Sequence, residues 1–334
     1  MFKGKRILVT GGTGSFGQKF TRRLLDEYEF ERLIIFSRDE FKQYTMKNEL
    51  IKEYGEEKIK KLRFFIGDVK DKDRLQRAFY AVDYVIHAAA MKHVPICEYN
   101  PFEAIKTNIH GAQNVIDAAL DQKVKKVVAL STDKAVNPIN LYGGTKLVSD
   151  KLFVAANAYT ASKETVFSIV RYGNVAGSRG SVIPLFKKII NEGVKSLPIT
   201  DMRMTRFWIT LDEGVDLVIK ALKDSKGGET YISKIPSFNI TDLARAIGGE
   251  GIELEEIGIR EGEKLHEIMV TTDDSSHTYE YEKHYIIYPQ YDWWNVEDYY
   301  EAGGKLVQPG FEYNSGTNKE WLSVEELTKL IMKL

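Results

Sequence analysis

Short apolar runs alternate with longer amphipathic segments through the first half of this chain. Unbroken apolar runs of about four to seven residues are typical of strands that are buried on both faces of a parallel sheet. The amphipathic segments between them fit the helices that connect such strands. The pattern predicts six strands, at Ile7–Thr10, Arg32–Phe36, Arg63–Ile66, Asp83–His87, Val127–Leu130 and Thr165–Arg171. We therefore expect an α/β fold with a doubly wound parallel sheet.

The alternation loosens beyond residue 174, which indicates a second unit. Helices are predicted there over Ser181–Gly193 and Ser323–Met332. We expect residues 1–174 plus about 207–235 to form a Rossmann domain. The remaining segments, about 175–206 and 236–334, are expected to form a smaller, discontinuous α/β substrate domain.

Composition excludes several classes of protein. The 334 residues carry a formal net charge of −1, which suggests no nucleic-acid or anionic-membrane partner. Cys97 is the one cysteine, so we expect no intrachain disulfide and no cysteine zinc cluster. His87 and His93 are expected to be packed or hydrogen-bonded, and no metal site is predicted. No apolar run reaches the roughly 18 residues of a membrane span. The first strand begins too early for a signal peptide, so we expect a cytoplasmic protein.

A glycine-rich loop directly follows the first predicted strand and precedes an amphipathic helix that runs to about Glu27. In such loops the first glycine makes a tight turn, the second lets backbone N–H groups approach a pyrophosphate, and the third lets the helix pack on the strand. The helix N-terminus favours the bound anion. The pattern predicts a dinucleotide site formed by Gly11, Thr13, Gly14, Ser15, Phe16 and Gly17.

The residues after the second predicted strand indicate which dinucleotide binds. An acidic residue at that strand end holds the ribose 2′-hydroxyl of NAD, whereas a small residue followed by arginine better accommodates a 2′-phosphate. Here the strand ends in Ser37 and Arg38, with Lys42 a few residues on. The sequence therefore favours NADP, although Asp39 would suit NAD.

Two further loops are expected to line the cofactor site. After the third strand, Asp68 is expected either to accept from the adenine amino group or to cap the helix that begins near Asp71, and Val69 follows it. After the fourth strand, small residues that begin at Ala88 leave space for a ribose. Lys92 lies in the same loop and is expected to contact both cofactor and substrate.

The segment Ser131–Lys146 is where we expect the chemistry. It follows an apolar strand and opens a helix near Tyr142, which places side chains at the carboxyl edge of the sheet. Tyr142 and Lys146 are four residues apart and share one helix face. A neighbouring ammonium lowers the pKa of a phenol from its usual value of about 10. Tyr142 could then take a proton from a sugar hydroxyl while hydride leaves the same carbon.

Several longer stretches carry a resemblance to a known family. They are Gly11–Gly17, Phe36–Glu40, Met91–Pro95, Ser131–Ala135, Arg171–Val175, Met204–Ile209 and Pro309–Tyr313. The chain resembles the extended short-chain dehydrogenase/reductase superfamily. Over essentially its whole length it resembles the soluble C5-inverting UDP-N-acetylglucosamine 4,6-dehydratases of the pseudaminic acid pathway. Relatives that act on glucose carry Asp-Glu where this chain has Asp133-Lys134. The Asp-Lys pair of this chain is similar to the pair in the enzymes that act on N-acetylglucosamine.

The resemblance implies a lyase that uses tightly bound NADP and acts on UDP-N-acetylglucosamine. Tyr142, tuned by Lys146, would deprotonate the C4 hydroxyl, and Thr132 would hydrogen-bond the C4 oxygen. Lys134 would act as base at C5 and Asp133 as acid at C6, although the sequence leaves open which does which. The residues that the resemblance implies for the UDP-sugar are Lys92, Asn174, Arg179, Thr200, Arg206, Arg260 and Glu263.

The resemblance also implies a homo-oligomer, formed of dimers that assemble into a hexamer. The helical segment Phe102–Leu120, in which Asn108 is expected to face the sheet, and the segment Tyr142–Tyr159 would form the dimer. Two other functions stay open at this point. A UDP-sugar 4-epimerase would use the same Tyr142 and Lys146 without elimination. A non-catalytic NADP-binding protein would need neither Asp133 nor Lys134.

Overall fold

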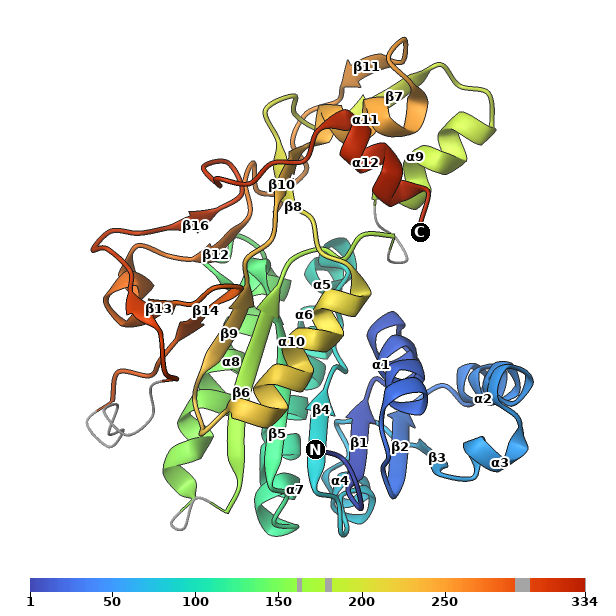
Figure 1. The fold of residues 1–334 in the computed structure, drawn as a ribbon, viewed down its shortest axis with the longest axis vertical. Coiled ribbons are helices and arrows are strands. Elements are labelled where there is room, and N and C mark those ends of the chain that lie inside the picture. The colour runs from blue at the N-terminus through green and yellow to red at the C-terminus, as the bar shows by residue number, and fades with distance from the viewer. Residues whose placement is uncertain (161–163, 178–181, 292–300, 334) are drawn as a thin grey trace.

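The structure is a computed structural model that describes residues 1–160, 164–177, 182–291 and 301–333. A large twisted sheet with helices on both faces forms the lower part of the molecule in Figure 1, and a smaller α/β unit lies above it. The carboxyl ends of the parallel strands point toward the smaller unit. Any ligand between the two units would therefore lie at the edge of the sheet where α/β proteins bind nucleotides.

All six strands that the sequence predicts are present and form a parallel sheet. Their bounds differ from the prediction by at most two residues at either end: β1 (Arg6–Thr10), β2 (Arg32–Ser37), β3 (Leu62–Ile66), β4 (Tyr84–His87), β5 (Lys126–Thr132) and β6 (Val166–Tyr172). A seventh parallel strand, β9 (Thr230–Ser233), follows β6 in the order β3-β2-β1-β4-β5-β6-β9. The chain reverses direction across the sheet between β1 and β4, which confirms the doubly wound topology.

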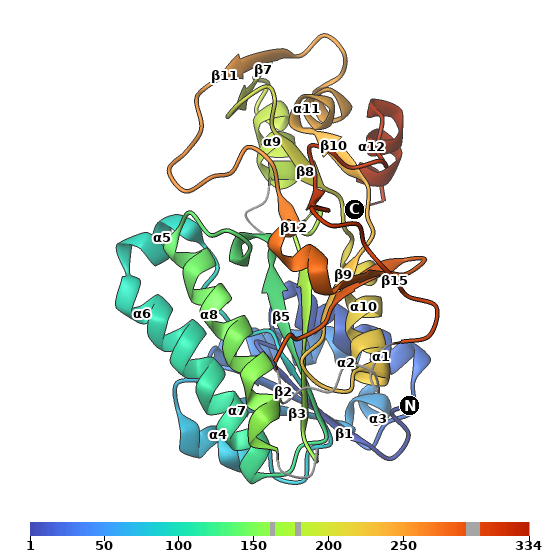
Figure 2. The same ribbon diagram turned by 90° about the vertical axis from the view of Figure 1, so that its left-hand side faces the viewer.

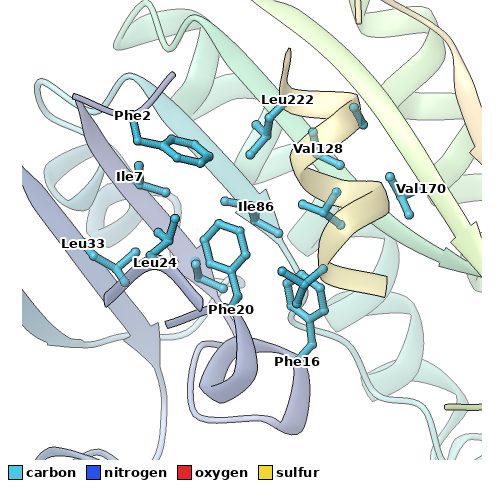
Figure 3. Close-up of a cluster of buried hydrophobic side chains, with 14 of the residues drawn as sticks. Phe2, Ile7, Phe16, Phe20, Leu24, Leu33, Ile86, Val128, Val170 and Leu222 are labelled. Carbon is cyan, nitrogen blue, oxygen red and sulfur yellow. The ribbon is translucent and has the colours of Figure 1, made fainter. Parts of the chain in front are cut away.

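Neighbouring residues of the buried strands point to opposite faces, and each face has its own helices. On one face, β5 contributes Val128 to a core with α1 (Ser15–Glu27), α2 (Glu40–Tyr54) and α10 (Leu211–Asp224). Figure 3 shows Phe16 and Phe20 of α1 and Leu222 of α10 among the side chains of this core. Burial of each large apolar side chain contributes about 1.5–3 kcal/mol.

The other face carries α4 (Lys72–Ala78), α7 (Gly111–Asp121) and α8 (Leu141–Ala155). Figure 2 shows these helices on the opposite side of the sheet from α1 and α10. Val127 of β5 belongs to this second core, next to Val128 of the first. Both faces are thus covered, which explains why the strands read as continuous apolar runs.

Three antiparallel strands extend the sheet beyond β9. They are β14 (His284–Ile287), β13 (Thr278–Glu280) and β15 (Lys305–Leu306). The sequence pattern predicts these residues in the substrate domain, whereas they hydrogen-bond to the large sheet. Their strands have two to four residues each, too short for a pattern with a period of two to be recognised.

The smaller unit combines short paired strands with three helices. Its strand pairs are β7 (Ser196–Ile199) with β11 (Glu253–Glu256), and β8 (Thr205–Phe207) with β10 (Ser237–Asn239). The helices are α9 (Val182–Asn191), α11 (Ile240–Gly248) and α12 (Val324–Ile331). A third pair, β12 (Ile268–Val270) with β16 (Tyr313–Asn314), connects this unit to the large sheet's edge.

The helix predicted at the end of the chain is confirmed, and its start has a clear cause. Ser323 caps α12 by accepting from the backbone N–H of Glu326, whose side chain in turn accepts from the backbone N–H of Ser323. Such a capping box satisfies two N–H groups that a helix start leaves unpaired. Among the residues described, the structure has no helix that is both long and apolar enough to cross a membrane.

Candidate active site

A cavity of about 590 Å³ lies at the carboxyl ends of the parallel strands. Loops that follow β1, β2, β3, β4, β5 and β6 all contribute to its walls. The predicted dinucleotide loop lines one end, and Lys134, Tyr142 and Asn174 line the other. The structure thus brings most of the predicted cofactor and catalytic residues to one cavity, whereas Gly17 and Asp133 do not line it.

The glycine-rich loop has the geometry that a pyrophosphate requires. Gly11 has a φ of +65°, and a Cβ there would lie 2.9 Å from the backbone of Ala89. A Cβ on Gly17 would lie 2.3 Å from the carbonyl oxygen of Gly12, so only glycine lets α1 approach the loop. Gly14 lines the cavity and precedes α1 without a side-chain cap. The N–H groups of the first turn of α1 can therefore bind an anion.

The adenosine end of the cavity is lined by Ser37, Arg38, Asp39 and Lys42. Asp39 is the N-cap of α2, where it accepts from the backbone N–H of Lys42 at 2.9 Å. Its other oxygen lies 3.2 Å from the Lys42 ammonium. The Asp39 carboxylate, which would suit NAD, is thus already hydrogen-bonded to the first turn of α2. Arg38 is mostly exposed, and its guanidinium lies 3.7 Å from Asp68.

Asp68 and Val69 line the cavity as predicted, together with Ala88 and Lys92. The cap of α4 is Asp71, which accepts from the backbone N–H of Arg74, so the capping role considered for Asp68 is wrong. Asp68 instead accepts from the backbone N–H of Lys70 at 2.9 Å. Its second oxygen stays directed to the Arg38 side of the cavity.

Asn108 fixes the loop that carries Ala88 and Lys92. Its side chain accepts from the backbone N–H of Met91 at 2.8 Å and donates to the carbonyl of the same residue at 2.9 Å. It also donates to Thr145 of α8 at 3.0 Å. A π-helical turn, Lys106–His110, places Asn108 there between α6 (Pro101–Ile105) and α7. The sequence predicts that Asn108 faces the sheet, but it does not indicate that Asn108 holds this loop in place.

Three consecutive predicted catalytic residues lie at the carboxyl end of β5, where Thr132 and Lys134 line the cavity and Asp133 between them does not. Thr132 donates to Asp133 at 2.9 Å, and the Lys134 ammonium lies 3.2 and 3.3 Å from the two Asp133 oxygens. Lys134 also donates to the side-chain oxygen of Asn174 at 3.3 Å. Asp133 is buried in a 3₁₀ turn, while Lys134 and Thr132 face the cavity. A carboxylate and an ammonium group therefore lie side by side at this end of the site.

Tyr142 and Lys146 are buried on one face of α8 and line the cavity. Burial and the Asp133 carboxylate raise the pKa of Tyr142, while a hydrogen bond with Thr132 lowers it. Burial lowers the pKa of Lys146, and Asp150 raises it. The prediction that the phenol pKa lies below its usual value is therefore wrong, because burial and the Asp133 carboxylate raise that pKa.

Asp150 is a buried carboxyl group on α8 that the predicted site does not include. It follows Lys146 by four residues on α8, is buried, and accepts from Ser131 at 2.5 Å. Burial raises its pKa, whereas Lys146 and Arg171 lower it. The positions 142, 146 and 150 share one helix face, so this spacing could have revealed it.

Most of the predicted substrate residues lie on the smaller unit, above the cavity. Arg206 donates to Glu263 at 3.3 Å, and the backbone N–H of Glu263 donates to the carbonyl of Arg260 at 3.1 Å. These three therefore form one group. Thr200 donates to the sulfur of Met204 and does not line the cavity, whereas Lys92 and Asn174 do. Arg179 lies outside the described residues.

His87 and Cys97 are both buried near the site. His87 is buried, with its Nδ1 atom 2.8 Å from the Thr10 hydroxyl, which confirms that it is hydrogen-bonded. Burial lowers its pKa to about 3, so it stays neutral. Burial raises the pKa of the Cys97 thiol, which packs beside Tyr142. Within the described residues, no group of three His, Cys, Asp or Glu side chains could hold a metal ion.

The close packing of α8 on the Asp133–Ala135 turn gives a testable pair of substitutions. A Cβ on Gly143 would lie 2.1 Å from the Lys134 carbonyl oxygen, whereas a Cβ on Gly144 meets nothing within 4 Å. We expect Gly143→Ala to displace the turn and lower turnover at least about tenfold, since a misplacement of 1 Å can cost 100-fold. Gly144→Ala should keep full turnover and raise stability by about 0.5–1 kcal/mol. Steady-state rates and thermal unfolding of both variants check this, and equal effects would contradict it.

The fold and the site together define an extended short-chain dehydrogenase/reductase that binds a nicotinamide dinucleotide. A family described as polysaccharide biosynthesis protein matches residues 7–289. The chain belongs to this family.

Relatives with known names cover the whole chain. A Campylobacter jejuni protein named UDP-N-acetylglucosamine 4,6-dehydratase (inverting) is 55% identical, with 99% of this chain and 98% of that protein covered. A Rickettsia felis protein named UDP-glucose 4-epimerase is 42% identical, with 100% and 97% covered. The crystal structure of Pen from Bacillus thuringiensis is 41% identical, with a TM-score of 0.87 over 100% of this chain and 99% of that one.

A more distant solved structure shares the architecture and contains a cofactor. The dTDP-glucose 4,6-dehydratase DesIV from Streptomyces venezuelae, with NAD and TYD bound, has a TM-score of 0.66 at 25% identity. The match covers 78% of this chain and 86% of that one.

Proposed function

We propose that the protein is a C5-inverting UDP-N-acetylglucosamine 4,6-dehydratase with tightly bound NADP. The observation that carries this proposal is that Lys134, which lines the cavity beside Tyr142, contacts the buried Asp133 carboxylate directly behind it. Oxidation of an alcohol at C4 needs a base such as Tyr142, and elimination of water across C5–C6 needs a second base and an acid. The 55% identity to a protein with this name supports the same substrate. The product would be UDP-2-acetamido-2,6-dideoxy-β-L-arabino-hexos-4-ulose, for glycans of the pseudaminic acid type.

A bound NADP would accept the hydride from C4 and return it to C6, so no net oxidation appears. Tyr142 takes the proton of the C4 hydroxyl, and Thr132 hydrogen-bonds the C4 oxygen. The resulting 4-keto group makes the C5 proton acidic. Lys134 then takes that proton while Asp133 donates one to the C6 hydroxyl, which leaves as water.

The contact between the two side chains supports these roles. Transfer of one proton across the 3.2 Å between the Lys134 ammonium and Asp133 gives a neutral amine and a carboxylic acid. These are the forms that a base at C5 and an acid at C6 require. Elimination returns the pair to ammonium and carboxylate. Final protonation of C5 from the opposite face inverts that centre.

The UDP moiety would contact the smaller unit. Arg206 and Arg260 are suited to the diphosphate, because guanidinium groups bind phosphate oxygens in pairs. Arg206 contacts Glu263 in the described structure, so we propose that this contact is exchanged or shared when the nucleotide binds. Asn174, Lys92 and Thr200 would complete the site.

Cofactor choice gives a separate expected result. With Asp39 engaged by α2, we propose that Arg38 binds the 2′-phosphate of NADP. Arg38→Ala should weaken NADP binding about 10- to 100-fold and leave NAD binding unchanged, since a charge-assisted hydrogen bond contributes about 1.5–3 kcal/mol. Titrations of the cofactor-free protein with each dinucleotide measure this, with Arg245→Ala as a control on the other unit. Equal loss of both affinities would contradict the assignment.

A homo-oligomer is part of the same proposal, with dimers that would assemble into a hexamer. Tyr99, Phe102 and Val148, on α5 (Val94–Tyr99), α6 and α8, are large apolar side chains that are exposed in the single chain. A dimer through these helices would cover them.

The second candidate function is UDP-sugar 4-epimerisation. It is favoured by the 42% identity to the Rickettsia felis protein of that name. Mass spectrometry of the reaction with UDP-N-acetylglucosamine, without added cofactor, separates the two. A product that has lost one water supports the dehydratase, and conversion to an isomer of unchanged mass supports the epimerase. An unchanged substrate would contradict both.

A further inference from the structure

Glu267 is a buried carboxyl group that the mechanism above does not use. It lies directly before β12 and is only 2% exposed. Its backbone is held on both sides, because its N–H donates to the Ser315 hydroxyl and its carbonyl accepts from the Ser315 N–H, each at 2.8 Å. The position of its side chain is therefore fixed by the β12–β16 pair rather than by a ligand.

Both oxygens of the Glu267 carboxyl group accept a hydrogen bond. One accepts from the backbone N–H of Phe207 at 2.9 Å, and the other accepts from the side-chain amide of Asn174 at 3.2 Å. The Arg206 guanidinium lies 3.6 Å from the oxygen that faces Asn174. Burial and Asp133 raise the pKa of Glu267 to about 7, while Arg206 and Lys134 lower it. Above that pKa the group is ionised and can only accept.

Asn174 connects Glu267 to the reactive lysine. Its amide nitrogen donates to Glu267, and its amide oxygen accepts from the Lys134 ammonium at 3.3 Å. A carboxylate can only accept and an ammonium can only donate, so one orientation of the amide satisfies both neighbours. The reversed amide would place two acceptors face to face on one side and two donors on the other.

We propose that Glu267 is a positioning residue that orients the Asn174 amide so that its oxygen holds Lys134 in place for elimination at C5. This inference rests on the proposed dehydratase function. It assigns Glu267 no contact with substrate or cofactor, and it predicts a defect in elimination alone.

The substitution Glu267→Gln tests the claim because it preserves size and replaces one acceptor by a donor. The buried Phe207 N–H makes the shorter of the two bonds, so the remaining oxygen of the new amide should stay with it. The new NH₂ group then faces Asn174, whose amide reverses to accept from it. Lys134 loses its acceptor and faces a donor instead. Elimination should slow about 10- to 100-fold, while C4 oxidation by Tyr142 continues.

The readout is the absorbance of reduced nicotinamide after NADP-loaded enzyme is mixed with saturating UDP-N-acetylglucosamine above neutral pH. Wild type should form product with little reduced cofactor, whereas Glu267→Gln should accumulate reduced cofactor. A variant that had merely lost its structure would not oxidise substrate at all. Glu229→Gln is the matched control, since Glu229 is an equally buried carboxyl in the large domain that accepts from backbone N–H groups. Its new amide must face one of those N–H groups and lowers stability, but oxidation and elimination should keep their wild-type balance.

A reciprocal substitution gives the rescue. Asn174→Asp alone places a second carboxylate against Glu267 and should slow elimination at least as much. The double variant Glu267→Gln with Asn174→Asp restores a donor facing an acceptor on one side and an acceptor facing Lys134 on the other. It should regain at least about tenfold over Asn174→Asp. If Glu267→Gln alone does not fold, this comparison of Asn174→Asp with the double variant carries the test.

The outcomes distinguish failure of this positioning role from failure of the proposed dehydratase function. Accumulated reduced cofactor in Glu267→Gln together with recovery in the double variant supports the positioning role. Undiminished elimination in Glu267→Gln, or loss without reduced cofactor and without recovery, overturns it while wild type still forms the 6-deoxy product. If wild type loses no water from UDP-N-acetylglucosamine, the proposed function fails and the inference falls with it.

Discussion

Lys134→Ala is expected to abolish the loss of water from UDP-N-acetylglucosamine while C4 oxidation continues. The substitution removes the amine that takes the C5 proton, and a positioned base contributes about 10²–10⁴ in rate. Tyr142, Lys146 and the glycine-rich loop are untouched, so the variant should still bind NADP. Mixing with substrate should therefore leave a reduced cofactor that persists. Product formation by mass spectrometry and cofactor absorbance measure the two steps separately.

The control for Lys134→Ala is a second lysine substitution away from the site. Lys188→Ala removes an exposed lysine on α9 whose ammonium lies 3.7 Å from Glu192, and it should not change either step. Thermal unfolding should accompany the assay, because removal of Lys134 leaves Asp133 buried without its ion pair. If Lys134→Ala keeps most of the turnover, this result would contradict elimination and favour an epimerase.

Tyr142→Phe is expected to block the reaction one step earlier. It removes only the phenol hydroxyl, so the packing beside Cys97 and the fold should be preserved. Without this base, C4 oxidation should fall about 10²–10⁴-fold, and no reduced cofactor should appear. The two variants thus have opposite signatures, with reduced cofactor present in Lys134→Ala and absent in Tyr142→Phe.

The pH dependence of the oxidation step follows from the pKa of Tyr142. Burial and Asp133 raise that pKa, so the phenol is mostly protonated near neutrality. The fraction that can act as a base grows as the pH rises, and the rate of C4 oxidation in wild type should grow with it. A rate that falls between neutral and moderately alkaline pH would contradict Tyr142 as the base.

The large sheet could be predicted because both of its faces are buried. Strands such as β5 contribute Val127 to one core and Val128 to the other, which produces unbroken apolar runs that are easily recognised. The strands β13 to β15 could not be predicted in the same way. They are only two to four residues long, and β14 is placed by pairing with β9, which lies far away in sequence. In turn, β13 pairs with β14 and β15 pairs with β13.

The candidate site likewise has a part that could be predicted from the sequence and a part that could not. Gly11, Tyr142 and Lys146 have fixed spacings within single segments, and the structure brings them to one cavity. Glu267 reaches Asn174 over 93 residues of sequence, so no local spacing indicates that contact. The pKa of Tyr142 depends on how deeply α8 is buried, which is a tertiary property that the spacing to Lys146 does not contain.

The central claim is that one site oxidises C4, eliminates water and inverts C5. Proton NMR of purified protein with UDP-N-acetylglucosamine in D₂O, without added cofactor, tests it most directly. A C5-inverting dehydratase should give a 6-deoxy-4-keto product with deuterium at C5 and the inverted configuration there. Formation of UDP-N-acetylgalactosamine alone, with no 6-deoxy signal, would contradict it.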